Sequence, residues 1–520
     1  MRVIDFFDRG LMLAPERACL SDDATEISYR EAAALTHQVA RLLRSLGVEP
    51  GDAVAFISPN DAFGYVAALG ILRAEAGWVP LNVRNTVADN IHHLEVGRPK
   101  ALLYHSSFEA DVAAYRAAVP SITHAICIDA AGAEGPGLRA RLEAFDATPV
   151  AYPAGRVDSA DLFRISCTGG TTGTPKGVRH NHLSYEMNVA AYLALWSFEA
   201  PPRFLLVAPM THAGGALAPP VFALGGTVRM MAKNDPLRIM QVIAAERISA
   251  AMLPPTAIYM LLDHPQVRDF DYSSLRYFMF AAAPMAPEKI RRAIDIFGPC
   301  FAQFYAQTEV ATTITWMSPG EYAQAVAEPE LAHRLRSAGR PGPFSVLGIM
   351  NADGQLLGDG EVGEIVVRSN QVMAGYVDQE EATREVFAYG WHHTGDLGYR
   401  DGDGYYYLVD RKRDLVITGG FNVFPGEVEK VLLAHPAIQD CAVIGIPDEK
   451  WGEALTAVVQ LAPGQVLDAE TLRAWSRERL SGVMTPKHYE FWEELPKSPV
   501  GKVLKRKIRD RFWQDQARAI

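Results

Sequence analysis

A stretch rich in glycine and threonine is the part of the sequence best suited to hold phosphate groups. It reads TGGTTGTPKG over residues 168–177 and follows the apolar segment Leu162–Cys167. Glycines let backbone N–H groups approach phosphate oxygens, threonine hydroxyls add donors, and Lys176 adds a positive charge. The stretch is not a Walker P-loop, because no GK[ST] follows at the required spacing. From composition alone, a flexible surface loop is an equally good interpretation.

Further segments combine glycines, aromatic rings and charged side chains. In chain order they read AAAP (281–284), YAQTE (305–309), GEIVVR (363–368), WHHTGDLG (391–398), DRKRD (410–414), TGGFNVFPGEVE (418–429) and LPKSPVGKV (495–503). Taken alone, YAQTE reads as the start of a surface helix, AAAP as a structural turn, and DRKRD as a charged turn. The paired glycines of TGGF read as a turn before a helix. The fixed order of these segments is stronger evidence than any one segment alone.

Together these segments resemble the adenylate-forming superfamily, which includes acyl-CoA synthetases, non-ribosomal adenylation domains and firefly luciferase. Residues 168–177 resemble the phosphate loop TSGTTGxPKG. The later segments resemble GGAP, YGxTE, GEIxVR, W(Y/F)RTGD, SGGxNxxPxEIE and LPxTxxGKV. The resemblance runs from the helix start at Tyr29 to Lys502. Two positions depart from the pattern. Gly169 replaces a serine, which costs about 1 kcal/mol of pyrophosphate contact, and Ala306 replaces a glycine.

The resemblance implies a small catalytic set. Lys502 would bridge the substrate carboxylate and the α-phosphate of ATP, and a preorganised charge of this kind is worth about 10²–10³ in rate. Thr308 would contact the α-phosphate, and Glu309 would hold Mg²⁺, for which a carboxylate is a suitable hard ligand. Tyr305 would stack on adenine. Asp396 would accept both ribose hydroxyls, because a carboxylate has two acceptor oxygens.

The same resemblance implies the other ligand-binding residues. The ATP and AMP set comprises Thr168, Gly169, Gly170, Thr171, Thr172, Gly173, Lys176, Ala283, Tyr305, Asp396 and Arg411. The acyl-pocket set comprises Met210, His212, Gly214, Gly215, Ala281, Ala282 and Gln307. These pocket residues predict a mostly apolar cavity with no clear second cation for a dicarboxylate. Gly419 and Gly420 leave room for the thin pantetheine arm of coenzyme A.

Alternating helical and strand patterns must position these residues. Ser28 and Glu31 have capping-box spacing before an apolar helical repeat, and Ala53–Ile57 and Ala101–Tyr104 read as strands. Such alternation predicts an α/β fold with a largely parallel sheet. The resemblance divides it into a large N-terminal domain of layered α/β subdomains, residues 1–410, and a small mobile α+β lid, residues 411–520. Arg413 would be the pivot of a hinge at about 410–413.

Composition narrows the class of protein. The 520 residues carry a net charge of −11, which argues against a general nucleic-acid binder. Five dispersed cysteines without a CxxC pair suit a reducing compartment and argue against a zinc site. No secretory signal or run of about 20 apolar residues is present, so we expect a cytoplasmic protein without a transmembrane segment. The sequence leaves a homodimer open.

The sequence thus predicts an ATP-, Mg²⁺- and coenzyme A-dependent ligase. It would activate a fatty, aromatic or ring-bearing carboxylic acid as the acyl-adenylate and then form the CoA thioester. Three alternatives stay open. They are a stand-alone adenylating enzyme, a luciferase-like oxygenase that uses the same adenylate, and a non-catalytic ATP-binding homologue, which the departures at Gly169 and Ala306 would favour.

Overall fold

The computed structural model describes residues 1–152, 159–168, 175–419, 421–448, 450–497 and 503–513. These residues form two compact units. Unit 1 holds the described residues of Met1–Thr168, Pro175–Leu347 and Val367–His392. Unit 2 holds those of Gly348–Val366 and His393–Ile520. Unit 2 therefore begins before residue 410, and a separately moving domain that starts at 411 stays a prediction.

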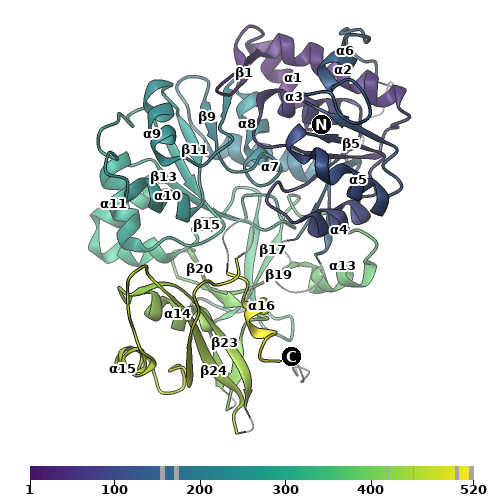
Figure 1. Ribbon diagram of the computed structural model, residues 1–520. Coiled ribbons are helices and arrows are strands. Elements are labelled where there is room, and N and C mark those ends of the chain that lie inside the picture. The colour runs from purple at the N-terminus through teal and green to yellow at the C-terminus, as the bar shows by residue number, and fades with distance from the viewer. Residues whose placement is uncertain (153–158, 169–174, 420, 449, 498–502, 514–520) are drawn as a thin grey trace. The chain divides into compact units, whose positions relative to one another are not determined.

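Two sheets form the framework of unit 1, counted over its described residues (Figure 1). The seven-stranded sheet has the order β18-β8-β7-β4-β3-β5-β6. Its strands are β3 (Ala53–Ile57), β4 (Gly77–Pro80), β5 (Ala101–Tyr104), β6 (His124–Cys127), β7 (Leu162–Cys167), β8 (Gly177–Asn181) and β18 (Gly375–Tyr376). Strands β3 to β7 are parallel to one another, whereas β8 pairs antiparallel with both β7 and β18. All five residues of β3 are buried, as in a parallel sheet covered on both faces.

The nine-stranded sheet has the order β15-β14-β13-β12-β11-β9-β10-β1-β2. Its strands are β1 (Ala18–Ser21), β2 (Glu26–Ser28), β9 (Arg203–Leu206), β10 (Thr227–Met230), β11 (Ala250–Met252), β12 (Tyr277–Phe280), β13 (Phe301–Tyr305), β14 (Thr315–Met317) and β15 (Arg340–Pro341). Strands β10, β9, β11, β12 and β13 are parallel neighbours. Their carboxyl ends therefore open on one edge, where ligands of α/β proteins usually bind.

Helices link and cover these strands. In unit 1 they are α1 (Ile4–Leu13), α2 (Tyr29–Ser45), α3 (Ala62–Arg73), α4 (Val87–Gly97), α5 (Glu109–Ala118), α6 (Leu138–Leu142), α7 (His182–Leu195), α8 (Ala218–Ala223), α9 (Pro236–Ala245), α10 (Pro255–Leu262), α11 (Pro287–Phe297), α12 (Pro319–Ala327) and α13 (Glu380–Val386). Short 3₁₀ turns span Ser106–Phe108, Gly215–Leu217, Pro329–Arg336 and Ala388–Gly390. The predicted capping box of α2 is confirmed, because the Ser28 and Glu31 side chains each bond the other's backbone N–H.

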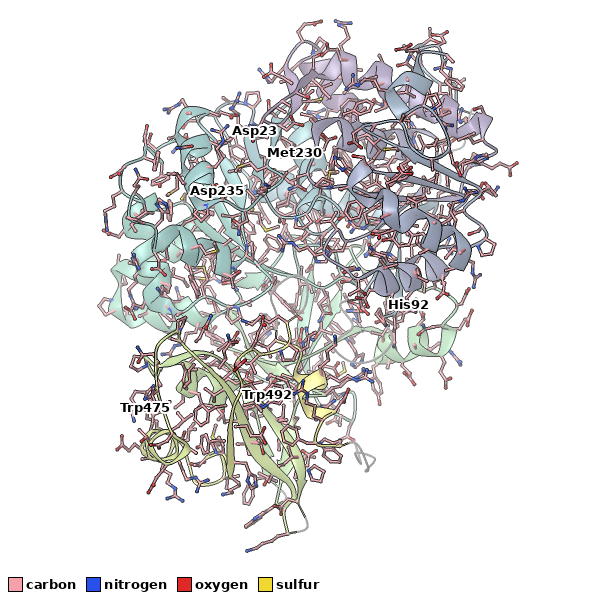
Figure 2. All side chains as sticks on the ribbon, viewed as in Figure 1. Asp23, His92, Met230, Asp235, Trp475 and Trp492 are labelled. Carbon is pink, nitrogen blue, oxygen red and sulfur yellow. The ribbon has the colours of Figure 1, made fainter. Side chains whose placement is uncertain are left out.

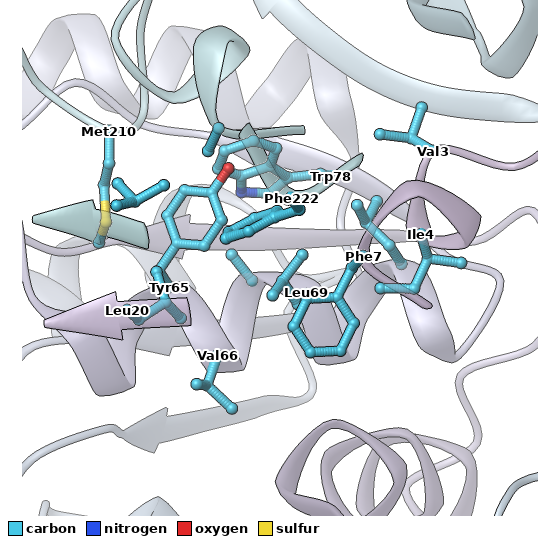
Figure 3. Packing of buried hydrophobic residues seen from close by; sticks show 14 of the residues in the cluster. Val3, Ile4, Phe7, Leu20, Tyr65, Val66, Leu69, Trp78, Met210 and Phe222 are labelled. Atoms are coloured by element: carbon cyan, nitrogen blue, oxygen red, sulfur yellow. The ribbon is translucent and has the colours of Figure 1, made fainter. Parts of the chain in front are cut away.

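The largest apolar core of unit 1 packs α1, α3 and α8 against both sheets. Figure 3 shows part of it, including Phe7, Tyr65, Trp78, Met210 and Phe222. Phe7 and Phe222 meet edge to face at 5.6 Å between ring centroids. Met210, which the sequence predicts in the acyl pocket, is fully buried in this core.

Unit 2 contains most of a four-stranded sheet and all of a second sheet. The first has the order β16 (Val346–Met350), β17 (Gly363–Arg368), β19 (His392–Arg400) and β20 (Tyr406–Arg411). The second is built from β21 (Val416–Thr418), β22 (Phe421–Val423), β23 (Ile438–Asp448), β24 (Gly452–Leu461) and β25 (His488–Phe491). Its helices are α14 (Pro425–Leu433), α15 (Ala469–Arg479) and α16 (Lys505–Arg509). Trp475 of α15, labelled in Figure 2, donates its indole N–H to the Val431 carbonyl at 3.1 Å.

Candidate active site

Three segments of unit 1 that carry predicted site residues leave the same edge of the nine-stranded sheet. Residues 210–215 follow β9, residues 281–283 follow β12, and Tyr305 is the last residue of β13. Because β9, β11, β12 and β13 are parallel neighbours, these segments start at adjacent carboxyl ends. The structure thus brings the predicted acyl-pocket and adenine segments to one edge.

The segment Tyr305–Glu309 is held by hydrogen bonds from several elements. Backbone N–H groups of Gln307 and Val310 each donate to the carbonyl of the other at 3.3 Å. The Tyr376 hydroxyl donates to Oε1 of Glu309 at 3.0 Å, and the Met373 N–H donates to the Glu309 carbonyl at 2.8 Å. The carboxylate predicted to hold Mg²⁺ is therefore oriented from both its side chain and its backbone.

His180 of β8 fixes the residue before this carboxylate. Its Nε2 lies 2.7 Å from the Thr308 carbonyl oxygen, and its Nδ1 lies 3.1 Å from Oγ of Ser184. A carbonyl can only accept, so Nε2 carries the proton of the neutral ring. Burial lowers the pKa of His180 to about 4, which keeps the ring in that neutral form at pH 7.

The two ends of the predicted phosphate loop are joined to each other. The Thr168 N–H donates to the Lys176 carbonyl at 3.0 Å, and the Lys176 N–H donates to Oγ1 of Thr168 at 3.1 Å. His92 of α4, labelled in Figure 2, has its Nε2 2.8 Å from the Pro175 carbonyl oxygen. Five predicted residues of this loop (Gly169, Gly170, Thr171, Thr172 and Gly173) lie outside the described residues.

Lys176 and Glu309 share one aromatic partner. The Lys176 ammonium lies 4.6 Å from the centroid of the Tyr376 ring, whose hydroxyl donates to Glu309. A cation over the face of a tyrosine is attracted by the negative face of the ring. Tyr376 therefore links the lysine at the end of the phosphate loop to the carboxylate of the Tyr305–Glu309 segment.

The loop after β9 leaves little room beside its glycines. A Cβ atom on Gly215 would lie 1.9 Å from the Met210 carbonyl oxygen, and one on Gly214 would lie 2.7 Å from that of Ala208. The Met210 N–H donates to Oδ1 of Asn60 at 2.7 Å. These contacts explain why glycine is needed at both positions. The Met210 side chain itself is buried in the core rather than at an open surface.

The other predicted pocket residues differ in exposure. Ala281 is buried, Ala282 and Ala283 are exposed, and His212 and Gln307 are half-buried. Ala282 has φ +73°, a left-handed conformation that alanine adopts at a cost. Their roles toward an acid or a nucleotide stay predictions.

Asp396 and Arg411 face each other in unit 2. They are register partners on β19 and β20, with Arg411 Nε 3.5 Å from Oδ1 of Asp396. The turn before Asp396 is held by Glu364, which accepts hydrogen bonds from Nδ1 of His393 at 3.0 Å and from the Gly395 N–H at 2.9 Å. Burial would raise the pKa of Glu364, but bonds from His393 and Lys412 outweigh it and lower that pKa. Glu364 thus supports the predicted ribose-binding carboxylate.

The predicted hinge and coenzyme A residues are also in unit 2. Arg413 is exposed, and the preceding Asp410 accepts the Gly426 N–H through Oδ2 at 2.7 Å. Gly419 has φ +59°, and a Cβ atom there would lie 2.7 Å from the ring of Trp451. Gly420 and Lys502 lie outside the described residues. The flanks of the Lys502 segment are joined by a bridge between Lys497 and Val503 and by the Leu504 N–H, which donates to Pro496 at 2.8 Å.

Comparison with known families decides the membership of the chain. Residues 7–377 match the AMP-binding enzyme family, and residues 427–502 match the AMP-binding enzyme C-terminal domain. The chain belongs to the adenylate-forming superfamily of AMP-binding enzymes. The predicted superfamily and fold class, a large N-terminal and a small C-terminal α/β part, are confirmed.

Relatives within this superfamily differ in the acids that their names record. Medium/long-chain-fatty-acid--CoA ligase FadD8 of Mycobacterium tuberculosis is 40% identical over 366 residues, which span 69% of this chain and 63% of that protein. Feruloyl-CoA synthase of Amycolatopsis sp is 35% identical over 97% of this chain and 98% of that protein. The amide bond synthetase McbA of Marinactinospora thermotolerans matches in structure with TM-score 0.86 and 30% identity, covering 98% of this chain and 100% of McbA.

Some residues of this candidate site carry no local signal in the sequence. Tyr376 and His92 contact the site from segments 67 and 83 residues away along the chain. The only indication of Tyr376 is its position shortly after GEIVVR. Within the described ranges, no helix is long and apolar enough to span a membrane, and no cluster of three or more His, Cys, Asp or Glu side chains is placed to hold a metal.

Proposed function

We propose that this adenylate-forming enzyme is an ATP-dependent acyl-CoA synthetase. It would join a hydrophobic carboxylic acid to AMP with release of pyrophosphate and then transfer the acyl group to the thiol of coenzyme A. The observation that carries the proposal is the shared contact of Lys176 and Glu309 with Tyr376. Through this contact, the lysine at the end of the phosphate loop and the predicted metal-binding carboxylate share one partner.

In the adenylation step, this chain's residues hold the nucleotide and steady the charge. Lys176 would leave the Tyr376 ring for the phosphates, while Tyr305 stacks on adenine and Asp396 accepts the ribose hydroxyls. A carboxylate such as Glu309 fits Mg²⁺, which would neutralise phosphate charge when bound with ATP. The acid's carboxylate attacks the α-phosphorus and pyrophosphate leaves. Lys502 would stabilise the negative charge that both reactants bring together.

In the thioester step, the thiol of coenzyme A loses its proton to solvent, its sulfur attacks the acyl carbon, and AMP leaves with the electrons of the broken C–O bond. We propose that the C-terminal part of the chain, beginning near residue 411 and pivoting at Arg413, presents Gly419 and Gly420 to the pantetheine arm for this step. The acid-binding residues would be Met210, His212, Gly214, Gly215, Ala281, Ala282 and Gln307. Relatives named for fatty and for aromatic acids support a hydrophobic acid of either class.

The experiment is an acid panel with ATP and Mg²⁺, scored for AMP and pyrophosphate with and without coenzyme A. AMP release that needs both an acid and coenzyme A, together with a thioester product, supports the ligase. Pyrophosphate exchange without thioester would support a stand-alone adenylating enzyme, and oxygen-dependent light would support an oxygenase. Failure to exchange pyrophosphate with any acid, despite ATP binding, would overturn catalysis altogether.

One observation favours an amine as a second candidate acceptor of the acyl group. The structural match with an amide bond synthetase at 30% identity covers nearly the whole chain. The same panel therefore includes an aliphatic amine in place of coenzyme A. Amide formation that outpaces thioester formation would replace coenzyme A by an amine as the acceptor.

A further inference from the structure

An open pocket lies on unit 1 where β17 ends. The space open to the centre of a water molecule is about 420 Å³. Its lining residues, among those described, lie at position 344 and within 367–392, all in unit 1. A pocket of this size with apolar walls and a few polar groups is typical of sites for small organic ligands. Of the described residues predicted to bind the nucleotide, the acid or coenzyme A, none lines it.

Arg368 is the cation of this pocket and the last residue of β17. Its guanidinium carbon lies 4.0 Å from the centroid of the Trp391 ring, and its Nε donates to the Gly390 carbonyl at 2.8 Å. Both contacts hold the planar guanidinium in place, so it is preorganised for a ligand. Arg368 is exposed, and within the described residues its terminal nitrogens form no hydrogen bond or ion pair. The N–H groups of both terminal nitrogens are therefore available.

Aromatic and aliphatic side chains form the apolar walls. Phe344 is 38% exposed, although it is a large hydrophobic residue. Val372 and Phe387 are half-buried, and the centroid of the Phe387 ring lies 5.9 Å from that of the His392 ring. Asn370 adds an exposed amide side chain that has no hydrogen-bond partner within the described residues. The pocket thus offers apolar surface and unused donors to the same ligand.

The charge of the pocket selects the kind of ligand. Arg368 is the only Lys, Arg, Asp or Glu residue among the described residues that line it. One guanidinium matches one carboxylate, whose two oxygens accept a parallel pair of N–H bonds. A nucleotide or coenzyme A carries several negative charges, and most of them would have no cation here. The phenylalanine rings favour a flat aromatic body, because aromatic pairs attract each other beyond the area that they bury.

The position of the pocket links it to the candidate active site. Val372 lines the pocket and forms a backbone bridge with Val310. The N–H of the next residue, Met373, donates to the Glu309 carbonyl at 2.8 Å. A ligand in the pocket would therefore touch the segment that pairs with the one carrying the predicted metal ligand.

We propose that this pocket binds one aromatic monocarboxylate, with its carboxylate on the guanidinium of Arg368 and its ring against Phe344 and Phe387. The site is separate from the proposed acid pocket. Binding is measured without ATP, so it does not depend on the proposed function. If the chain also activates such an acid, the free acid would occupy two sites at high concentration.

The first test is calorimetric titration of the full chain with 4-bromobenzoate in the absence of ATP. The proposed acid pocket would contribute a second site, so the quantity measured is the difference that Arg368→Gln makes. We expect this variant to weaken binding at one site by about tenfold, because hydrogen bonds between charged groups are lost. 4-Bromobenzyl alcohol has the same ring without the charge, and its binding should not change in Arg368→Gln. A 4-bromobenzoate titration that Arg368→Gln leaves unchanged would overturn the proposal.

Arg479→Gln is the matched control. The Arg479 guanidinium carbon lies 3.6 Å from the centroid of the Trp475 ring, and its Nη1 donates to the Trp475 carbonyl at 3.2 Å. Arg479 does not line this pocket. Arg479→Gln should therefore keep the full response to 4-bromobenzoate. An equal loss of binding in Arg479→Gln would assign the effect to the general loss of a stacked arginine and overturn the site.

The second test locates the acid without any variant. Crystals soaked in 4-bromobenzoate should show an anomalous bromine peak beside Phe344 and Phe387, with the carboxylate oxygens about 2.8 Å from the terminal nitrogens of Arg368. Bromine found only elsewhere on the chain would overturn the proposal. A peak in the pocket with no site weakened in Arg368→Gln would mark binding at crystal concentration only, which also overturns it.

Discussion

The two units differ in which ionisable side chains they bury. Unit 1 buries His37, His93, His180 and His182 as neutral rings, and burial lowers the pKa of each to about 4. Unit 1 also holds ion pairs, such as that of Arg73 with Asp8. In unit 2, the buried ionisable side chains include a lysine and a carboxylate. Lys505 Nζ lies 2.9 Å from Oε1 of Glu429, with side chains only 18% and 15% exposed.

The difference follows from what each group must hold. Two of the rings in unit 1, those of His93 and His180, bond the carbonyls of Ile165 and Thr308 through Nε2 at 3.2 and 2.7 Å. A neutral ring does this without placing a further charge near the nucleotide site. In unit 2, Glu429 also accepts the Val443 N–H at 2.7 Å, so one ion pair ties α14, β23 and α16 together. We therefore expect a fall in pH to destabilise unit 1 before unit 2.

The largest expected effect is therefore on the pH dependence of unit 1. Its buried histidines stay neutral to about pH 4, whereas in the unfolded chain they take up a proton below their ordinary value of 6.5. Unfolding then takes up protons, and stability falls as the pH falls from 6.5 to 4. At pH 5 each such histidine costs about 2 kcal/mol. Hydrogen exchange at pH 7 and 5, corrected for intrinsic rates, should show lower protection in unit 1 peptides.

Two buried carboxyl groups of unit 2 provide the opposite sign. Burial raises the pKa values of Asp410 and Glu429 despite the nearby Lys505. The folded unit then binds their protons more readily than the unfolded chain does, so acid does not destabilise it through these groups. His180→Gln should flatten the pH dependence of unit 1, and the control His488→Gln, at an exposed position in unit 2, should not. An equal loss of hydrogen-exchange protection in both units at pH 5 would contradict this difference between the units.

The next effect concerns the buried charges of unit 2. Lys505→Met leaves Glu429 and Asp410 without their cation, and removing one partner of a buried pair costs about 3–5 kcal/mol. Urea unfolding, followed by hydrogen exchange of unit 2 peptides, measures the loss. Lys487→Met is the matched control, because Lys487 is exposed and its ammonium donates to the neutral Gly482 carbonyl at 3.3 Å.

A second substitution tests the charge directly. Glu429→Gln added to Lys505→Met removes the unpaired carboxylate but keeps an oxygen to accept from Val443. We expect the double variant to regain more than half of the lost stability. If it is no more stable than Lys505→Met, the cost came from lost packing rather than from charge.

Lys502 lies three residues before Lys505, but it is predicted to be catalytic rather than structural. Substitutions at the two lysines should therefore have different effects. Lys502→Ala should slow adenylation about 10²–10³-fold, while hydrogen exchange in unit 2 stays unchanged. A supplied acyl-adenylate should still become the thioester. Equal loss of both steps in a folded variant would refute the proposal that Lys502 serves adenylation while Gly419 and Gly420 serve thioester formation.

Gly419→Leu should do the reverse, with adenylation kept and thioester formation lost. The matched control is Gly464→Leu, since Gly464 has φ +77° and no neighbouring atoms within 4 Å of an added Cβ, so it carries the backbone strain alone. Coenzyme A turnover that survives Gly419→Leu would remove Gly419 from the pantetheine path.

Much of the fold could be predicted from local patterns. The strands at Ala53–Ile57 and Ala101–Tyr104 match their predicted bounds, and the helix predicted after the Ser28–Glu31 capping box is found as α2 (Tyr29–Ser45). Each rests on hydrophobic runs or periodicity within about a dozen residues, which a sequence displays directly. The ordered motifs likewise sufficed to predict the superfamily.

The contacts that orient the site could not be predicted. Tyr376 meets Glu309 and His180 meets Thr308 across 67 and 128 residues, because separate strands end at neighbouring positions. No local period encodes such pairs. Arg164 reads as an interruption of an apolar run, and only the pairing of β7 with β4 shows that it lies beside Trp78.

The smallest predicted effect tests whether unit 1 orients Glu309 through a neutral donor. Tyr376→Phe keeps the ring under Lys176 and removes only the hydroxyl that donates to Oε1 at 3.0 Å. A hydrogen bond to a charged group contributes about 1.5 kcal/mol, so the Mg²⁺ concentration for half-maximal adenylation should rise about tenfold. Direct binding of Mn²⁺ in the presence of ATP, followed by electron paramagnetic resonance, should weaken by the same factor.

The control removes a similar bond elsewhere. Tyr407→Phe deletes a hydroxyl that donates to Asp401 at 2.9 Å in unit 2, and it should leave the metal requirement unchanged. Tyr376→Ala should in addition lower the KM for ATP, because Lys176 no longer has to leave the ring when the nucleotide binds. If Tyr376→Phe binds Mn²⁺ as tightly as the unsubstituted chain, the Tyr376 hydroxyl does not orient the metal ligand. The hydrogen bond from Tyr376 to Glu309 would then serve stability alone.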